Sequence, residues 1–226
     1  MFDLDDTLYL ERDYVASGFR AAATLVSEHS THAQSVVYDW LWAEFCSGDH
    51  SNALERLVVE FPVAELSVET LVEAYRSQDP KINLLPDVAP MLDDLRDSGK
   101  RIGMITDGDS ARQRKKVAAL GLLNMVDELL VTGDLGLSYW KPHPRSFEVM
   151  QNRLDADRLT YVGDNPHKDF VAPNALGWTT ARLEMEGQLH AGAAVTEPTG
   201  SPHFVVHSIA ELASLLNRNS ASRPST

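Results

Sequence analysis

The sequence has little cysteine, little positive charge and no long apolar run. Cys46 is its single cysteine, so no disulfide can form within the chain, which suits a reducing compartment such as the cytoplasm. No stretch approaches the roughly 18 uninterrupted apolar residues of a membrane-spanning helix, which argues against a membrane span. No basic segment followed by an apolar one stands at the N-terminus, so the sequence predicts no secretion signal and a cytoplasmic protein.

The shortage of positive charge excludes some partners. The chain has 33 acidic residues against 20 lysines and arginines, which gives a formal net charge of −13 at pH 7. Such an excess repels polyanions, and we therefore expect neither nucleic acid nor an anionic membrane as a partner. The 226 residues suffice for one large domain, or for a core with a smaller inserted domain. A monomer and a homodimer are both compatible with these features.

The most informative motif lies in the first seven residues, Met-Phe-Asp-Leu-Asp-Asp-Thr. Alternate residues of an extended strand project to the same side, so Asp3 and Asp5 are expected to converge just past the end of a short strand. Two carboxylates held together repel each other unless a cation lies between them or one of them is protonated. The pair suits a hard cation such as Mg²⁺ together with a nucleophilic carboxylate. An EF-hand loop is excluded, because Leu8 stands where that loop needs glycine.

Two further motifs suit the binding of an anion. Residues 101–108 predict a strand that ends in Thr106, whose hydroxyl, with the backbone N–H groups of Asp107 and Gly108, suits a phosphoryl oxygen. Lys141 stands in the sequence Trp-Lys-Pro-His-Pro-Arg, where two prolines fix the chain just ahead of an expected helix. With so acidic a chain, the attraction for phosphate must come from such local groups and from a metal ion.

The fourth motif, Tyr161–Asp169, predicts a strand, a glycine-aspartate turn that contains Asp164, and a second acid at Asp169. Each motif has an ordinary alternative: Thr106 as a helix cap, Lys141 as a surface lysine, and the glycine-aspartate pair as any turn. Their occurrence together, in a fixed order, favours one functional site.

The pattern of apolar residues predicts the fold class, α/β with a Rossmann-like parallel sheet and helices on both faces. In such a sheet ligands bind at the carboxyl ends of the strands, which is where the motifs fall. Residues 186–202 are predicted to form a surface loop, and their sequence gives little information about function. The expected strands are 102–106, 128–132, 159–162, 179–183 and 203–206, and the expected helices are 88–98, 111–120, 145–154, 168–175 and 209–216.

The segment between the first two motifs carries helical periodicity only, from about residue 13 to residue 78, with breaks at 47–51 and at Pro62. It predicts an all-helical bundle inserted into the α/β core. The predicted domain limits are 1–10 and 82–216 for the core, 11–81 for the bundle, and 217–226 for a polar, disordered tail.

The four motifs resemble, in order, those of the haloacid dehalogenase-like hydrolase superfamily, over roughly residues 1 to 183. The resemblance implies that the inserted bundle is the family's helical cap, which opens and closes over the site. It also implies a Mg²⁺-dependent phosphatase acting on a small phosphorylated metabolite, either a sugar phosphate or a nucleoside monophosphate. The segment from Glu11 to Asp79 holds 12 acidic residues against four arginines, which favours substrates with one phosphate and a neutral remainder.

The same resemblance assigns a role to each site residue. Asp3 attacks phosphorus and forms an aspartyl-phosphate, while Asp5 protonates the leaving oxygen and then activates water. Asp169 orients Lys141 or a metal-bound water. The implied metal ligands are Asp3, the backbone carbonyl of Asp5, and Asp164, and the implied phosphate-binding group is Thr106, Asp107, Gly108 and Lys141.

Several alternatives remain at this stage. Dehalogenases of the superfamily do not keep an acid/base at the position of Asp5, and phosphonate hydrolysis requires a cap lysine, whereas the first lysine here is Lys81. Both activities fit poorly, but a phosphomutase keeps the same four motifs. Only Met1 and Phe2 precede Asp3, where relatives have a longer apolar strand, which suggests a misassigned start codon or a trimmed chain. A phosphate-binding or scaffold protein that has lost activity is therefore a further alternative.

Overall fold

The computed structural model describes residues 1–48, 52–195 and 197–218. It divides into two compact units, one of Met1–Arg12 together with the chain from Asn83 onward, and the other of Asp13–Ile82. The first unit combines strands and helices, and the described elements of the second are all helices.

Short parallel strands form the centre of the first unit. All four residues of β1 are buried, as expected for a parallel strand that is covered on both faces. The sequence predicted the limits of these strands to within one residue at each end. The pairs are β1 (Gly103–Thr106) with β2 (Glu128–Val131), and β4 (Thr179–Leu183) with both β3 (Thr160–Gly163) and β5 (Phe204–Val206).

The first three residues of the chain join the two groups of strands. Phe2 forms parallel bridges with both Met104 of β1 and Val162 of β3. The N–H of Phe2 donates to the carbonyl of Gly103 (2.9 Å), and the N–H of Asp3 donates to the carbonyl of Val162 (2.8 Å). The order across the sheet is therefore β2, β1, this N-terminal segment, β3, β4 and β5. Asp3 thus lies at the carboxyl ends of the strands, between β1 and β3.

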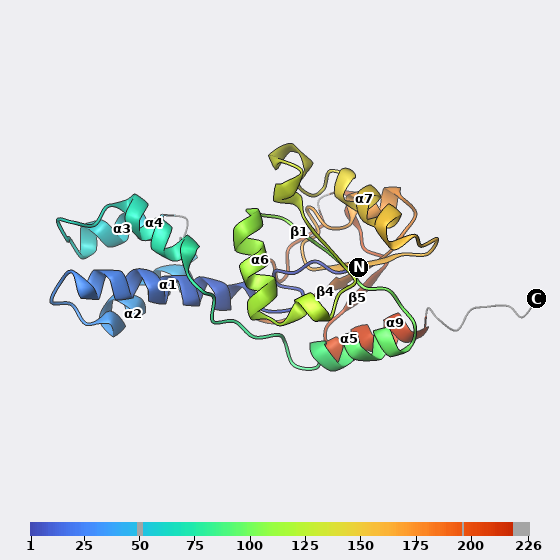
Figure 1. Ribbon diagram of the computed structural model, residues 1–226, viewed down its shortest axis with the longest axis horizontal. Helices are drawn as coiled ribbons and strands as arrows, with labels where there is room; N and C mark the ends of the chain where they lie inside the picture. Colours follow the sequence, from blue (N-terminus) through green and yellow to red (C-terminus); the bar gives the residue numbers. More distant parts are fainter. Residues whose placement is uncertain (49–51, 196, 219–226) are drawn as a thin grey trace, which may run out of the picture. The chain divides into compact units, whose positions relative to one another are not determined.

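Helices cover the strands on both faces, as Figure 1 shows for α7 (Arg145–Leu154) above them and for α5 (Val88–Asp97) and α9 (Ile209–Arg218) below them. The α/β prediction with a Rossmann-like parallel sheet is confirmed. Phe147, Met150 and Leu154 follow one another at helical spacing on α7, and they pack into a buried cluster below that helix. The cluster consists of Met1, Ile105, Leu130, Phe147, Met150, Leu154, Tyr161, Ala172 and Trp178.

Two predicted helix limits differ from the structure by more than one residue. The helix expected from Lys168 starts only at Val171, as α8 (Val171–Ala175), because Asn165 holds the preceding residues in a turn. The side-chain oxygen of Asn165 accepts from the N–H of His167 (3.0 Å), and its carbonyl accepts from the N–H of Asp169 (3.0 Å). The tail expected from residue 217 is also wrong at its start, since α9 continues to Arg218. The remainder of that predicted tail, residues 219–226, lies outside the described residues.

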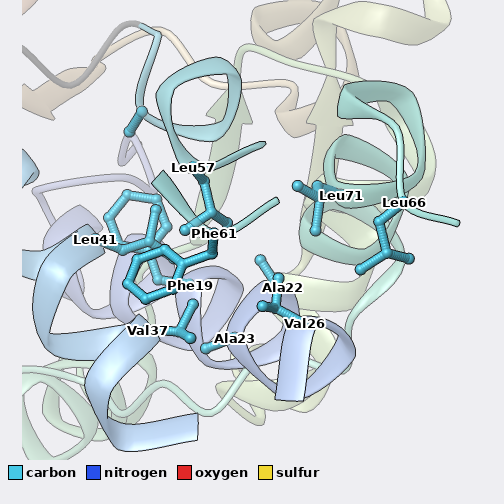
Figure 2. Close-up of a cluster of buried hydrophobic side chains, with 11 residues drawn as sticks. Phe19, Ala22, Ala23, Val26, Val37, Leu41, Leu57, Phe61, Leu66 and Leu71 are labelled. Carbon is cyan, nitrogen blue, oxygen red and sulfur yellow. The ribbon is translucent and has the colours of Figure 1, made fainter. Parts of the chain in front are cut away.

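The second unit is the predicted helical bundle. Phe19, Ala22, Ala23 and Val26 lie on one face of its first helix and meet apolar residues of the other three helices in a buried cluster (Figure 2). The side chain of Ser67 accepts from the N–H of Thr70 and caps the last helix of the unit. The helices are α1 (Glu11–Glu28), α2 (Gln34–Cys46), α3 (Ala53–Glu60) and α4 (Val68–Ser77).

No helix in the described part of the chain combines the length and the apolar composition needed to cross a membrane. The remaining described elements of the first unit are one helix and several short turns. α6 (Ser110–Ala119) follows β1, and its N-cap Asp109 accepts from the N–H of Arg112 (3.0 Å). The single-turn helices are η1 (Leu122–Asn124), η2 (Thr132–Asp134), η3 (Leu137–Tyr139) and η4 (Pro198–Gly200).

Candidate active site

A buried lysine lies between two aspartates at the carboxyl ends of the strands. Lys141 Nζ is 2.8 Å from Asp3 Oδ1 and 2.7 Å from Asp169 Oδ1, and it donates to the hydroxyl of Tyr161 (3.1 Å). Burial alone lowers the pKa of Lys141, but the carboxylates of Asp169 and Asp3 outweigh it and hold the pKa well above the ordinary lysine value. Lys141 is therefore an ammonium ion that holds the pKa of Asp169 below its ordinary value. It only partly offsets burial at Asp3, whose pKa burial raises to about 6.

Asp3 belongs to a group of three buried acids with Asp164 and Asp169, whose nearest carboxylate oxygens all lie within 4.8 Å of one another. Among the described residues, the Oδ2 atoms of Asp3 and Asp164 are buried and find no hydrogen-bond partner. Burial, followed by the neighbouring carboxylates of Asp169 and Asp3, raises the pKa of Asp164 to about 9. Buried carboxylate oxygens in this number and spacing fit a hard divalent cation, which would keep Asp164 ionised.

Asp169 differs from the other two acids, because both of its oxygens already accept hydrogen bonds. Oδ1 accepts from Lys141 and, at 3.3 Å, from the hydroxyl of Tyr161, and Oδ2 accepts from the N–H of Asn165 (2.9 Å). A Cβ at Gly163 would lie 2.6 Å from Asp169 Oδ2, so only glycine leaves room for this carboxylate. Of the two roles that the sequence left open for Asp169, these contacts favour the support of Lys141.

The carboxylate of Asp5 lies outside this group of three acids and has hydrogen-bond partners of its own. Its Oδ1 accepts from the hydroxyl of Tyr9 and from Lys116 Nζ (2.6 Å), and its Oδ2 accepts from Gln113 Nε2 (2.7 Å). The chain leaves the extended conformation directly after Asp3 and enters a turn, so strict strand alternation does not set the direction of the Asp5 side chain. The backbone carbonyl of Asp5, rather than its side chain, was the implied metal ligand, and that assignment stays a proposal.

Positive charge and hydrogen bonds keep Asp5 ionised. Burial raises the pKa of Asp5, but the ion pair with Lys116 and the hydrogen bonds from Lys116, Tyr9 and Gln113 outweigh it and hold the pKa below its ordinary value. The side chain of Asp5 is 15 % exposed, against 2 % for that of Asp3.

Three of the four residues expected to bind phosphate, Thr106, Asp107 and Gly108, lie at and just beyond the end of β1. Thr106 is fully buried, and its Oγ1 accepts from Gln113 Nε2 (2.5 Å). The carboxylate of Asp107 accepts from the hydroxyl of Thr132 (2.8 Å) and from the N–H of Lys141 (3.1 Å), and so it fixes the segment that carries Lys141. Gly108 follows with a φ of 141°, in a backbone conformation that favours glycine.

Two side chains of α6 that the sequence did not reveal belong to this site, namely Gln113 and Lys116. They lie three residues apart, and both are buried, at 3 % and 5 % exposed. A helix places residues at this spacing on one face. They stand in the run Arg-Gln-Arg-Lys-Lys, where a sequence of only polar residues gives no apolar periodicity to show which side chains turn inward.

A second omission is Gln188, in the segment predicted as a surface loop of little information. That prediction is wrong for Gln188, which is 7 % exposed and whose Nε2 donates to the carbonyls of Asp6 (2.7 Å) and Leu183 (3.0 Å). The carboxylate of Asp6 accepts from the N–H groups of Leu189 (2.7 Å) and Glu11 (2.7 Å). The loop after β4 therefore fixes the turn that follows Asp3.

Residues 1–177 match the family model described as haloacid dehalogenase-like hydrolase. This chain belongs to that family. The match covers all four motifs, and the prediction of the family from those motifs is confirmed.

Similar proteins support the same assignment. A glyceraldehyde 3-phosphate phosphatase from Methanopyrus kandleri is 28 % identical over 193 residues, which cover 81 % of this chain and 82 % of the relative. A ribulose-1,5-bisphosphate 5-phosphatase from Halopiger xanaduensis is 28 % identical over 208 residues, which cover 81 % of this chain and 83 % of the relative. Among solved structures, a HAD family hydrolase from Deinococcus radiodurans R1 with bound phosphate and sodium is similar, with a TM-score of 0.68 at 19 % identity. The alignment covers 99 % of this chain and 96 % of that chain, and it shows that the two share a fold.

Proposed function

We propose that this family member is a Mg²⁺-dependent phosphatase that hydrolyses a small phosphomonoester through an aspartyl-phosphate on Asp3. The observation that carries the proposal is the buried group of Asp3, Asp164 and Asp169 around Lys141, with the Oδ2 atoms of Asp3 and Asp164 unpaired among the described residues. Such a group combines a charged nucleophile, a fixed cation and oxygens suited to a divalent metal ion.

The metal site fits Mg²⁺ by the chemistry of its donors. Asp3, the backbone carbonyl of Asp5, and Asp164 would hold the ion, since all three offer the hard oxygen atoms that Mg²⁺ prefers. Bound Mg²⁺ supplies positive charge that offsets the charge on the transferring phosphoryl group.

In the first half-reaction, an oxygen of Asp3 forms the bond to phosphorus while the bond from phosphorus to the leaving oxygen breaks. Lys141 contributes twice, because its charge opposes the burial that raises the pKa of Asp3 to about 6, and because it offsets negative charge on the phosphoryl group during transfer. Thr106 and the backbone N–H groups of Asp107 and Gly108 hold the same oxygens.

Asp5 transfers protons in both half-reactions. It donates a proton to the leaving oxygen, and in the second half-reaction it takes a proton from the water that cleaves the aspartyl-phosphate. Asp5 is a carboxylate in this structure, which suits the second task. The first task requires the acid form, and the approach of a doubly charged phosphoryl group favours it, since a nearby negative charge raises the pKa of a carboxyl group.

The substrate class follows from charge and from the relatives. We propose that the helical unit, residues 11–81, acts as the cap over the site, and that its excess of acidic residues favours one phosphate with a neutral polar remainder. A sugar phosphate comes first and a nucleoside monophosphate second. The relative named a glyceraldehyde 3-phosphate phosphatase supports a phosphorylated sugar. Cytoplasmic localisation, a monomeric or homodimeric state, and the absence of a nucleic-acid partner belong to the same proposal.

The test is a panel of phosphorylated compounds assayed for released phosphate with and without Mg²⁺. It includes triose, pentose and hexose monophosphates, nucleoside monophosphates, and bisphosphates, because one relative is named for a bisphosphate. We expect release from a sugar monophosphate at the highest kcat/KM, and only with the metal. No release from any compound contradicts the phosphatase, conversion of a sugar 1-phosphate to the 6-phosphate without free phosphate indicates a mutase, and a preference for bisphosphates contradicts the substrate class.

A further inference from the structure

Gln113 connects two residues that the proposed reaction uses for different tasks. Its Nε2 lies 2.7 Å from Asp5 Oδ2 and 2.5 Å from Thr106 Oγ1. Gln113 is 3 % exposed and Thr106 is fully buried. Because water does not reach these side chains, their polar atoms depend on hydrogen bonds to each other and to Asp5.

The chemistry of the three groups decides which atom donates. An ionised carboxylate only accepts hydrogen bonds, so the amide nitrogen of Gln113 must face Asp5. The –NH₂ group has two hydrogens, and the second is then directed at Thr106 Oγ1. A threonine hydroxyl has one hydrogen of its own. Because Oγ1 accepts from Gln113, the hydrogen of Thr106 is left to donate to another acceptor.

We propose that Gln113 is a positioning residue that fixes the Thr106 hydroxyl as a hydrogen-bond donor toward the phosphoryl oxygen. This inference rests on the proposed function, in which Thr106 binds the phosphoryl group. A hydroxyl that is already oriented loses no rotational freedom when phosphate binds, which increases affinity. Lys116 holds the other oxygen of Asp5, so that Asp5 in turn keeps the amide of Gln113 in place.

Substitution of Gln113 separates this role from simple packing. Gln113→Glu keeps the shape but replaces the –NH₂ group by a carboxyl oxygen beside Asp5. The two carboxyl groups share one proton between them, so that oxygen has none to give Thr106 and instead accepts the Thr106 hydrogen, which is then lost to the phosphoryl group. Gln113→Leu removes the hydrogen bonds and leaves the hydroxyl free to rotate. We expect the affinity for inorganic phosphate to fall about 3- to 10-fold in Gln113→Leu, the cost of ordering one freed hydroxyl. We expect about a 10- to 100-fold fall in Gln113→Glu, which loses one hydrogen bond to a charged group.

A double-mutant cycle with Thr106→Val supplies the decisive measurement. The dissociation constant of inorganic phosphate is measured by calorimetry on the whole chain with Mg²⁺ for the wild type, both single variants and the double variant. We expect Gln113→Leu to have less than about a 2-fold effect once Thr106 is valine, because no hydroxyl remains to be oriented. Equal effects of Gln113→Leu in both backgrounds, or wild-type affinity in Gln113→Glu, overturn the proposal.

Two control variants keep the test interpretable. Gln151→Leu removes a glutamine on α7 that accepts from the indole of Trp178 (3.2 Å), and it should leave the affinity for phosphate unchanged. Thr106→Ser keeps a hydroxyl and should keep the full dependence on Gln113, and loss of that dependence contradicts the proposal. If Gln113→Leu does not fold, Gln113→Glu and Thr106→Ser still decide. Because binding is measured without turnover, a protein that binds phosphate but hydrolyses nothing removes the proposed function and leaves this inference standing.

Discussion

The first unit contains two lysine–aspartate ion pairs with similar N–O distances. They differ in how many of the aspartate oxygens accept hydrogen bonds from the described residues. Lys141 and Asp3 are 2.8 Å apart at the carboxyl ends of the strands, and the side chain of Lys141 is fully buried. Lys116 and Asp5 are 2.6 Å apart between α6 and the turn after Asp3. Both oxygens of Asp5 accept hydrogen bonds, whereas Asp3 Oδ2 is buried without a partner among the described residues.

The difference indicates different tasks. Groups of the protein donate hydrogen bonds to both carboxylate oxygens of Asp5. These bonds fix the direction of the Asp5 side chain, as an acid/base group requires. The pair of Lys141 and Asp3 needs a further positive group, because a buried carboxylate oxygen without a partner carries a large desolvation penalty. That unpaired oxygen is the reason we propose this pair as the place where a metal ion and a phosphoryl group bind.

The largest expected effect follows from removing the charge of Asp3. Asp3→Asn keeps the shape of the side chain but cannot form the aspartyl-phosphate, so kcat should fall by at least about 10³-fold. Asp134→Asn is a matched control, since Asp134 is 44 % exposed and pairs with Arg114 on the surface. Steady-state kinetics of both variants provide the measurement, and near-normal turnover in Asp3→Asn removes the proposed mechanism.

Asp5→Asn should reduce turnover through proton transfer alone, by about 10²–10⁴-fold. With an activated substrate, whose leaving group needs no proton, Asp3 should still become phosphorylated and the reaction should then stop, because the water lacks its base. Acid-quench mass spectrometry should find the adduct on Asp3 in Asp5→Asn and not in Asp3→Asn. An adduct at another residue would refute the division of labour between the two aspartates.

The two lysines should also differ in their contribution to stability. Lys141→Met leaves Asp3 and Asp169 buried without their common cation, which should cost about 3–5 kcal/mol of unfolding free energy. Lys116→Met should cost less, about 1–3 kcal/mol, because Asp5 keeps its bonds from Tyr9 and Gln113 and is partly exposed. Urea unfolding of both variants without metal gives the comparison. Equal losses would contradict the distinction between the two pairs.

A further expected effect, similar in size to that of Lys116→Met, concerns the metal ion. Mg²⁺ at 100 times its dissociation constant should stabilise the wild type by about 2.7 kcal/mol. Asp164→Asn should lose most of this gain, and Asp5→Asn should keep it, because only the backbone carbonyl of Asp5 is proposed to bind the ion. Thermal unfolding with and without Mg²⁺, and after removal of the ion with a chelator, measures the difference. Full stabilisation of Asp164→Asn would exclude Asp164 as a ligand.

Local sequence was enough to predict most elements of this protein. The helix from Arg145 to Leu154 was predicted with its correct limits, because Phe147, Met150 and Leu154 repeat at helical spacing after two prolines. The strand from Thr179 to Leu183 was predicted equally well. The order of the four motifs was sufficient to identify the family, since each motif is a short run whose chemistry can be recognised without its neighbours.

The tertiary structure alone decided how the side chains of the site are paired. Asp5 meets Gln113 and Lys116 across 108 and 111 residues of sequence, and Gln188 meets Asp6 across 182. Such contacts have no periodicity to reveal them, because a polar residue on a polar helix or loop gives the same pattern whether its side chain faces solvent or the site. The sequence determined which residue types reach the ends of the strands. The packing of α6 determined that both oxygens of Asp5 have hydrogen-bond partners, whereas one oxygen of Asp3 has none among the described residues.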